Sequence, residues 1–413
     1  MNEHTDRAQD RITSTVSKGL QGVREAAQRD KGLRFTTLLH HVNEKRLLDS
    51  FCLLKKEAAP GVDRVTWSEY EEGVEVRITD LHDRIHRGAY RAQPSRRVYI
   101  PKPDGRQRPL GIAAVEDKIV QLAVTTVLNQ IYEEDFAGFS YGFRPEQGAH
   151  DALDSLTAGI MTKKVNWILD ADIKGFFDNI SHGKLMELIE LRIADPRILR
   201  LIGKWLTAGV SEDGQWSETK VGTPQGAVIS PLLANIYLHY VLDQWVMEWR
   251  KVHADGDVIV VRYADDFVLG FQRRDEAESF LKQLRERMAE YGLELHSEKT
   301  RLIEFGRFAE GNRKRVGAGK PETFNFLGFT HICSTIHKSG KFTVKRKTIG
   351  KRMTAKLHDV AAKLRKRMND PIEQTGNWLK QVVRGYFHYH AVPGNLKRLY
   401  TFRREIARHW RSR

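Results

Sequence analysis

The sequence predicts an α+β fold, in which antiparallel strands alternate with helices before an all-helical end. Two observations carry this expectation. Residues 258–269 place two β-branched and aromatic runs around a tight acidic turn, a pattern typical of a β-hairpin. From residue 348 onward apolar residues recur at helical spacing between basic faces, with breaks only at Pro371 and at Pro393 and Gly394.

The other elements follow in order along the chain. Residues 1–30 are polar, and we expect them to be mobile. Residues 33–57 carry apolar residues at helical spacing, and Pro60 stops that helix. Further expected elements are a helix over 66–90, a strand–turn–strand unit over 96–112, helices to about 135 and over 147–160, a strand ending at Asp172, a helical stretch over 183–208, a helix from Asp275, and strands around 301–305 and 324–345.

The acidic turn of the hairpin is Tyr263, Ala264, Asp265 and Asp266. Adjacent carboxylates repel each other, and a divalent cation between them relieves that repulsion. Hard oxygen ligands of this kind suit Mg²⁺. The alternative interpretation is a solvated turn in which Asp simply favours the bend.

A second acidic position comes earlier, where an apolar run ends in alternating acids. Asp170 and Asp172 point to the same face of the expected strand, and the carbonyl of Ile173 is free at the strand end. Asp172 and Asp265 on neighbouring strands would hold two metal ions, the arrangement used for in-line phosphoryl or nucleotidyl transfer. The alternative for Asp172 is an ordinary acid at a strand end.

A third element lies between these two. Gly222 and Gly226 flank a Thr-Pro-Gln turn, and glycines allow the backbone of such a turn to approach a ligand closely. The segment that follows is apolar nearly all round, which predicts a buried helix.

These three elements, in this order, resemble the reverse transcriptases, and specifically those encoded by group II introns, also called maturases. Further blocks that match the family lie at residues 59–63, 99–112, 141–145, 324–329 and 384–386. The resemblance implies a right-hand polymerase, with fingers and palm built from an antiparallel sheet with helices on one side and an all-helical thumb. The implied domains are a mobile N-terminus (1–30), an N-terminal extension of the fingers (31–75), fingers and palm (76–340) and a basic thumb or maturase domain (341–413).

The resemblance also implies the catalytic residues. Asp172 and Asp265 would ligate two Mg²⁺ ions directly, with Mn²⁺ as a substitute, together with the Ile173 carbonyl. Asp266 would be a weaker third carboxylate. Lys299 matches the lysine proposed to protonate the departing pyrophosphate, and its alternative is a surface lysine after a strand.

The implied nucleotide contacts come from three places in the chain. Phe177 aligns with the steric gate, a bulky ring that excludes a ribose 2′-OH. Gln225 would contact the incoming nucleotide, while Lys102 and Arg108 would hold its triphosphate by charge-assisted contacts. The alternatives are core packing for Phe177 and solvated hairpin charges for the two basic residues.

Basic residues gather at the C-terminal end. Residues 341–413 hold 20 Lys and Arg against 4 Asp and Glu, a balance of +16, so the remainder of the +15 chain is nearly neutral. Interleaved aromatic residues favour a nucleic-acid surface, because basic groups neutralise phosphates and rings stack on unpaired bases. The alternative is a set of solvated helix faces. The candidate RNA-binding residues are Lys363, Arg365, Lys366, Arg367, Arg384 and Tyr386.

Cysteine content and hydropathy argue against a zinc-binding, disulfide-rich, membrane-spanning or secreted protein. The chain has only Cys52 and Cys333, without a Cys-x-x-Cys pair, so neither a zinc knuckle nor a disulfide framework is indicated. This cysteine usage points to a reducing cytoplasm. The expected location is the bacterial cytoplasm or nucleoid. No apolar run is long enough to span a bilayer, and the polar N-terminus lacks a signal-peptide core.

The function implied by the resemblance is that of a group II intron RNA-directed DNA polymerase, which also binds intron RNA to assist splicing and mobility. Its partners would be intron RNA, an RNA template with its primer, dNTPs and target DNA, and the oligomeric state stays open. Many relatives continue past the thumb into a nuclease domain, which is not expected here because the sequence ends at Arg413. The alternatives are an RNA-binding splicing cofactor without polymerase chemistry, or a related polymerase recruited to host defence.

Overall fold

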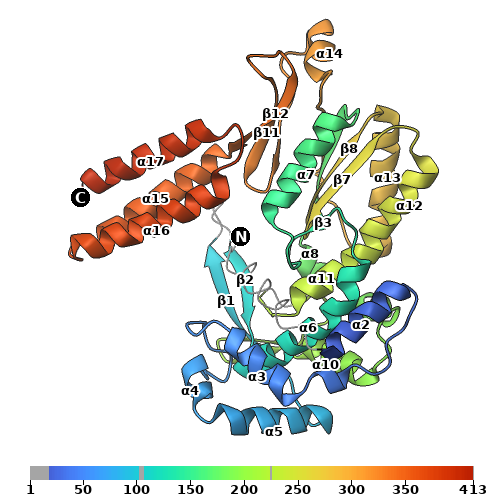
Figure 1. The fold of residues 1–413 in the computed structure, drawn as a ribbon, viewed down its shortest axis with the longest axis vertical. Helices are drawn as coiled ribbons and strands as arrows, with labels where there is room; N and C mark the ends of the chain where they lie inside the picture. The colour runs from blue at the N-terminus through green and yellow to red at the C-terminus, as the bar shows by residue number, and fades with distance from the viewer. Residues whose placement is uncertain (1–17, 102–106, 224–225, 413) are drawn as a thin grey trace.

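The structure is a computed structural model that describes residues 18–101, 107–223 and 226–412. Lys102 and Gln225, both expected at the site, lie outside these ranges. Figure 1 shows a mainly helical N-terminal region at one end, a sheet with flanking helices beside it, and three long C-terminal helices standing to one side. The α+β fold is confirmed, and the all-helical end begins at Gly350.

The main sheet holds five strands. Their spatial order is β3 (Ser140–Tyr141), β7 (Val258–Tyr263), β8 (Asp266–Phe271), β4 (Trp167–Asp172) and β9 (Arg301–Glu304). Neighbouring strands are antiparallel, except that β3 runs parallel to β7. The expected hairpin of β7 and β8 and the expected strand ending at Asp172 are therefore both present.

Both faces of this sheet are buried, so the expectation of helices on one side is wrong. Val260 and Leu269 pack into the core shared with α13 (Arg274–Glu290). Val261 and Val268 pack on the opposite face, against α7 (Ala149–Thr162). Figure 1 shows α7 and α13 on either side of β7 and β8. A strand that is covered on both faces carries apolar side chains at nearly every position, as β7 does here.

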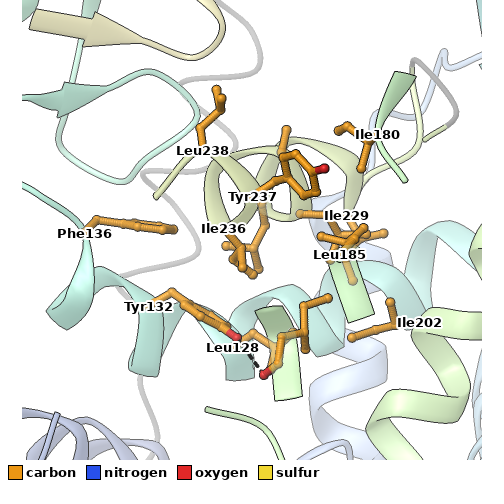
Figure 2. Close-up of a cluster of buried hydrophobic side chains, with 14 of the residues drawn as sticks. Leu128, Tyr132, Phe136, Ile180, Leu185, Ile202, Ile229, Ile236, Tyr237 and Leu238 are labelled. Carbon is orange, nitrogen blue, oxygen red and sulfur yellow. Dashed lines mark hydrogen bonds between the residues drawn. The ribbon is translucent and has the colours of Figure 1, made fainter. Parts of the chain in front are cut away.

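The N-terminal region is built around α6 (Val115–Asp135), which is buried along most of its length. α2 (Lys18–Arg29) packs against α6 through Leu20, Val23 and Ala27, so residues 18–29 do not form the mobile segment that we expected. Figure 2 shows how the C-terminal half of α6 meets side chains from α9 (His182–Glu190), α10 (Pro196–Thr207) and α11 (Ser230–Leu238). One continuous core therefore joins this region to the main sheet.

Two expected helices differ from the structure. The helix expected over 33–57 begins only at Glu44 as α3 (Glu44–Leu53), where the Asn43 side chain accepts a hydrogen bond from the Arg46 N–H. Upstream, Phe35 pairs with the chain at Ile193 instead, so tertiary contacts override the apolar spacing. The helix expected over 66–90 divides into α4 (Trp67–Glu71) and α5 (Val74–His86), because Gly73 adopts a left-handed conformation.

A four-stranded sheet of order β2-β1-β5-β6 lies next to the N-terminal helices, and a three-stranded sheet of order β10-β11-β12 leads into the C-terminal helices. The two strands of the expected strand–turn–strand unit are present as the antiparallel pair β1 and β2, whereas its expected turn lies outside the described residues. The elements not bounded so far are η1 (Leu39–His41), β1 (Ser95–Pro101), β2 (Gln107–Ile112), α8 (Phe176–Asn179), β5 (Val210–Glu212), β6 (Gln215–Ser217), η2 (His239–Asp243), α12 (Gln244–His253), α14 (Ala309–Arg315), β10 (Phe324–Phe326), β11 (Phe329–Thr335), β12 (Phe342–Thr348), α15 (Gly350–Lys366), α16 (Ile372–His390) and α17 (Leu396–Arg411).

The helices α15, α16 and α17 enclose a small core of their own, which includes Val360, Leu364 and Phe402. The breaks expected at Pro371 and Gly394 separate these helices. Among the described residues, none of the helices combines the length and apolar character needed to cross a membrane.

Candidate active site

Three carboxylates meet at one edge of the main sheet. β4 pairs with β8 so that Asp172 lies opposite Asp266, and β8 pairs with β7 so that Asp266 lies opposite Tyr263. The turn of that hairpin is Ala264 and Asp265, and Ala264 has a positive φ of 55°. Strand register therefore brings together acids that are far apart in the sequence.

Burial and neighbouring negative charges leave Asp265 and Asp266 poorly stabilised as anions. Burial raises the pKa of Asp265, and the charge of Asp172 raises it further. The pKa of Asp266 is raised to about 7, chiefly by burial and then by the charges of Asp265 and Asp172. A divalent cation at this edge would relieve both effects, because an opposite charge favours the ionised carboxylate.

The Ile173 carbonyl is directed toward the same place. Ile173 and Leu295 form an isolated antiparallel bridge. Its hydrogen bonds come from the flanking residues: Lys174 N–H donates to the Glu294 carbonyl, and His296 N–H donates to the Asp172 carbonyl. Successive backbone groups of a strand point to opposite sides. The carbonyl of Ile173 therefore points away from Leu295, to the side on which β8 lies.

The carboxylate and carbonyl oxygens at this edge suit a hard cation as ligands, although they do not surround a metal position completely. In the part of the chain that the structure describes, no three His, Cys, Asp or Glu side chains are already gathered around a metal position. Mg²⁺ is commonly held by one or two carboxylates, its own waters and substrate phosphates instead of an all-protein cage. Two or three carboxylates and one backbone carbonyl at an open edge match that mode of binding.

Lys299 neutralises one of the three acids. Its Nζ lies 2.7 Å from Oδ2 of Asp172, and the lysine side chain is 51% exposed. Ion pairs of such exposure contribute little stability and exchange readily with other ligands. Next to it, Arg301 pairs with Asp170 at 3.3 Å. The lysine expected near the reaction centre thus lies beside Asp172.

The two glycines on either side of the expected contact residue Gln225 lie close to the backbone of other segments. A Cβ added at Gly222, whose φ is +89°, would lie 2.8 Å from the Phe177 carbonyl oxygen. Thr223 N–H donates to that same oxygen at 2.8 Å. At the other end of the turn, a Cβ on Gly226 would lie 2.8 Å from the Gly111 carbonyl oxygen in β2. Gly222 is therefore packed against α8 and Gly226 against β2.

Phe177 and Arg108 are the expected nucleotide contacts that the structure describes. Phe177 is half-buried at the start of α8, with its ring centroid 5.3 Å from that of the buried Phe176. Arg108 in β2 is exposed, and it lies close enough to Asp265 for its positive charge to oppose the rise in that pKa. The charge of Arg108 thus acts on the carboxylate edge, whereas Phe177 packs against the hydrophobic core beside Phe176.

The expected RNA-binding residues divide into two groups. Lys363, Arg365, Lys366 and Arg384 are exposed on α15 and α16. Arg367 is half-buried, pairs with Asp370 at 3.0 Å and lies over the Trp378 ring at 5.0 Å.

Tyr386 corrects the expectation for its own role. Its ring is stacked on Phe402 with centroids 3.6 Å apart, and the residue is only 8% exposed. A ring covered in this way belongs to the core of the C-terminal helices. As placed, it cannot present a face to an RNA base.

Two arginines near the carboxylates were not among the predicted site residues, and Arg262 was expected to have at most a structural role. Arg352 in α15 lies close enough for its charge to oppose the rise in the pKa of Asp266. Arg262 in β7 is completely buried and donates to the Ala264 carbonyl at 3.0 Å. The position of Arg262, one residue before Tyr263, was the only local signal, because its partners come from elsewhere in the chain.

Comparisons with known proteins agree with this geometry. The family model for reverse transcriptase (RNA-dependent DNA polymerase) matches residues 100–331, more than half of the chain. Protein YkfC of Escherichia coli (strain K12) is 34% identical over 276 residues, which cover 59% of this chain and 72% of YkfC.

Two intron-associated proteins are also similar. Group II intron-encoded protein LtrA of Lactococcus lactis subsp. cremoris is 44% identical over 181 residues, 44% of this chain and 29% of LtrA. An uncharacterized 91 kDa protein in a cob intron of Schizosaccharomyces pombe is 33% identical over 250 residues, 59% of this chain and 31% of that protein. The match thus spans less than a third of each of these two relatives. With the family model covering both the carboxylate strands and the hairpin, the chain belongs to the reverse transcriptase (RNA-dependent DNA polymerase) family.

Proposed function

We propose that this chain is an RNA-directed DNA polymerase of the group II intron type, which extends a primer on an RNA template using dNTPs. The observation that carries the proposal is the strand register that sets Asp172 opposite Asp266, with Asp265 in the adjoining turn. In this assignment residues 76–340 form the fingers and palm, and residues 341–413 form the thumb.

The carboxylate edge supplies the chemistry. Asp172, Asp265 and the Ile173 carbonyl would hold two divalent ions, Mg²⁺ or Mn²⁺, with Asp266 as a weaker ligand. Such ions, when bound, activate the attacking oxygen and steady the leaving group of an in-line transfer. Lys299, which pairs with Asp172, would donate a proton to the departing pyrophosphate.

The surrounding residues would select and orient the nucleotide. Arg108 carries a fixed positive charge near Asp265, which suits a contact with the triphosphate. Phe177 would place its ring beneath the sugar and exclude a 2′-OH. Gln225 and Lys102 complete this proposed contact set. Gln225 belongs to the turn whose glycines are held against α8 and β2.

Primer extension tests the proposal directly. The purified chain is given a DNA primer annealed to an RNA template, with dNTPs and Mg²⁺. We expect DNA product that is absent when Mg²⁺ is chelated and that returns with Mn²⁺. Absence of product with either metal, from protein shown to be folded, would remove the polymerase assignment and leave an RNA-binding role.

The similarity to LtrA favours a second role, because that relative is named as a group II intron-encoded protein. We propose that the exposed Lys363, Arg365, Lys366 and Arg384 contact intron RNA to assist splicing and mobility, with target DNA as a further partner. Splicing assistance needs RNA binding and not metal chemistry.

The two roles should therefore separate in one variant. The change Asp265→Asn/Asp266→Asn should abolish DNA synthesis while intron RNA binding and splicing stimulation are retained. Gel-shift titration and a self-splicing time course measure the latter two. Loss of RNA binding in this variant would argue against two separable activities.

A further inference from the structure

Arg262 is a completely buried arginine whose five N–H groups all have partners. Nε and Nη2 donate to the two carboxylate oxygens of Asp243, at 2.7 and 2.5 Å. Nη1 donates to Asn235 Oδ1 at 2.9 Å and to the Ala264 carbonyl at 3.0 Å. Nη2 also donates to Ser140 Oγ at 2.6 Å. A guanidinium has five such donors in a rigid fork, so this site uses all of them.

The bond to Ala264 links this network to the catalytic turn. Ala264 has a φ of +55°, a conformation that side chains other than Gly rarely adopt. Its N–H donates to the Tyr141 carbonyl at 3.1 Å, and its carbonyl accepts from Arg262. The Ala264 carbonyl and the Asp265 N–H belong to one planar peptide group. Holding that carbonyl therefore fixes the direction in which Asp265 leaves the turn.

A π-helical turn brings the partners of Arg262 to one face. α11 ends at Leu238, and His239–Asp243 is π-helical before α12 begins. Residues eight apart in an uninterrupted α-helix, such as Asn235 and Asp243, would point roughly 80° apart, since each residue turns about 100°. A π turn absorbs one extra residue, which reduces the difference to about 20°. Single π turns of this kind occur frequently at functional sites.

We propose that Arg262 is a positioning residue, which acts with Asp243 through the Ala264 carbonyl to aim Asp265 at the divalent-ion site. The inference rests on the proposed polymerase function, and it adds to it the device that holds the catalytic turn. A purely structural role for this buried pair is the competing explanation, and the experiment must separate the two.

The test compares conservative variants of two buried arginines. Arg262→Lys keeps a charge but loses the fork that reaches Ala264. Arg192→Lys is the matched control, because Arg192 is also buried, pairs with Asp135 at 2.8 Å, and also donates to backbone carbonyls, in this case near the N-terminal helices. A second variant, Arg262→Met/Asp243→Leu, replaces the pair by apolar groups, a change that buried ion pairs often tolerate.

Mn²⁺ binding is the decisive readout. It is measured by electron paramagnetic resonance in a complex with RNA template, chain-terminated DNA primer and dNTP, at a temperature where every variant is folded. We expect Arg262→Lys and the double variant to weaken Mn²⁺ binding about 10- to 100-fold, the range seen when residues that orient metal ligands are removed. The kcat of extension should fall similarly with little change in the KM for dNTP, whereas Arg192→Lys should lower only the unfolding midpoint.

Wild-type Mn²⁺ affinity in either Arg262 variant would overturn the proposal, and so would an equal loss of affinity in Arg192→Lys. Failure of the proposed function has a different signature, since the wild-type chain would then show no metal-dependent extension.

Discussion

The exposed basic residues of α15 offer a quantitative test of the RNA surface. Lys363, Arg365 and Lys366 are changed together to Gln. Arg367 is left unchanged because it already engages Asp370 and the Trp378 ring. Lys363 also pairs with Asp359, but both side chains are about half exposed, so this pair does not prevent a phosphate contact.

The size of the effect follows from counting contacts. Each phosphate contact contributes roughly 0.7 to 0.9 to the slope of log K against log salt, so losing three should lower the slope by about 2 to 3. Raising the salt from about 50 to 200 mM, a fourfold range, lowers the affinity of both proteins. The factor by which wild-type affinity falls should be roughly 20 to 40 times larger than the factor for the triple variant.

Fluorescence anisotropy with a structured intron RNA, titrated at several salt concentrations, measures both affinity and slope. The control is Lys282→Gln/Arg285→Gln, which removes exposed charges from α13, outside the C-terminal helices. If the triple variant keeps the wild-type affinity and slope, the C-terminal excess of charge is a solvated surface. The principal RNA site would then lie among the N-terminal helices.

Three further changes give distinct outcomes. Phe177→Val should raise the ratio of kcat/KM for rNTP to that for dNTP about 10- to 100-fold if the ring is the gate; an unchanged ratio in folded protein would make Phe177 core only. Tyr386→Ala should lower the free energy of unfolding by about 3 to 5 kcal/mol, because it empties a buried site, while the salt slope of RNA binding stays constant. The pKa of buried His331 is lowered to about 3 by burial and by Arg346, so it is neutral in the fold and takes up a proton on unfolding below about pH 6.5. Stability should therefore fall as pH drops through this range, and His331→Phe should reduce that loss by up to about 1.4 kcal/mol per pH unit, measured by urea unfolding at several pH values.

Patterns within short stretches of sequence predicted the hairpin and the strand that carry the acids of the site. The alternating and apolar runs around the acidic turn specify a hairpin, and the acids at the end of a neighbouring strand specify the edge where they meet. The structure confirms both through the pairing of Asp172 with Asp266. Family resemblance then assigned the roles of these acids, which periodicity alone leaves open between a metal site and a solvated turn.

Features that depend on contacts between segments far apart in the chain could not be predicted from the sequence. Arg262 and Asp243 lie in different elements, and the π turn that aligns Asp243 has no compositional signature. The helix expected over 33–57 does not extend over Leu38 and Leu39, because the N–H groups of these residues donate hydrogen bonds to Asp195, far along the chain. Tyr386 resembled a base-stacking ring in sequence, yet the position of Phe402 in the next helix decides its burial.

Metal-dependent nucleotidyl transfer at the carboxylate edge, as proposed above, is tested most directly by one comparison of rates. Single-turnover extension of a DNA primer on an RNA template is measured with Mg²⁺ for wild type, Asp265→Asn and Asp275→Asn. Asp275 is an exposed acid at the start of α13, paired with Arg273, and serves as the matched control. We expect Asp265→Asn to lower the rate by about 100-fold or more, equivalent to roughly 2.7 kcal/mol of lost transition-state stabilisation, while Asp275→Asn stays near wild type. A rate for Asp265→Asn within a fewfold of wild type would contradict this proposal.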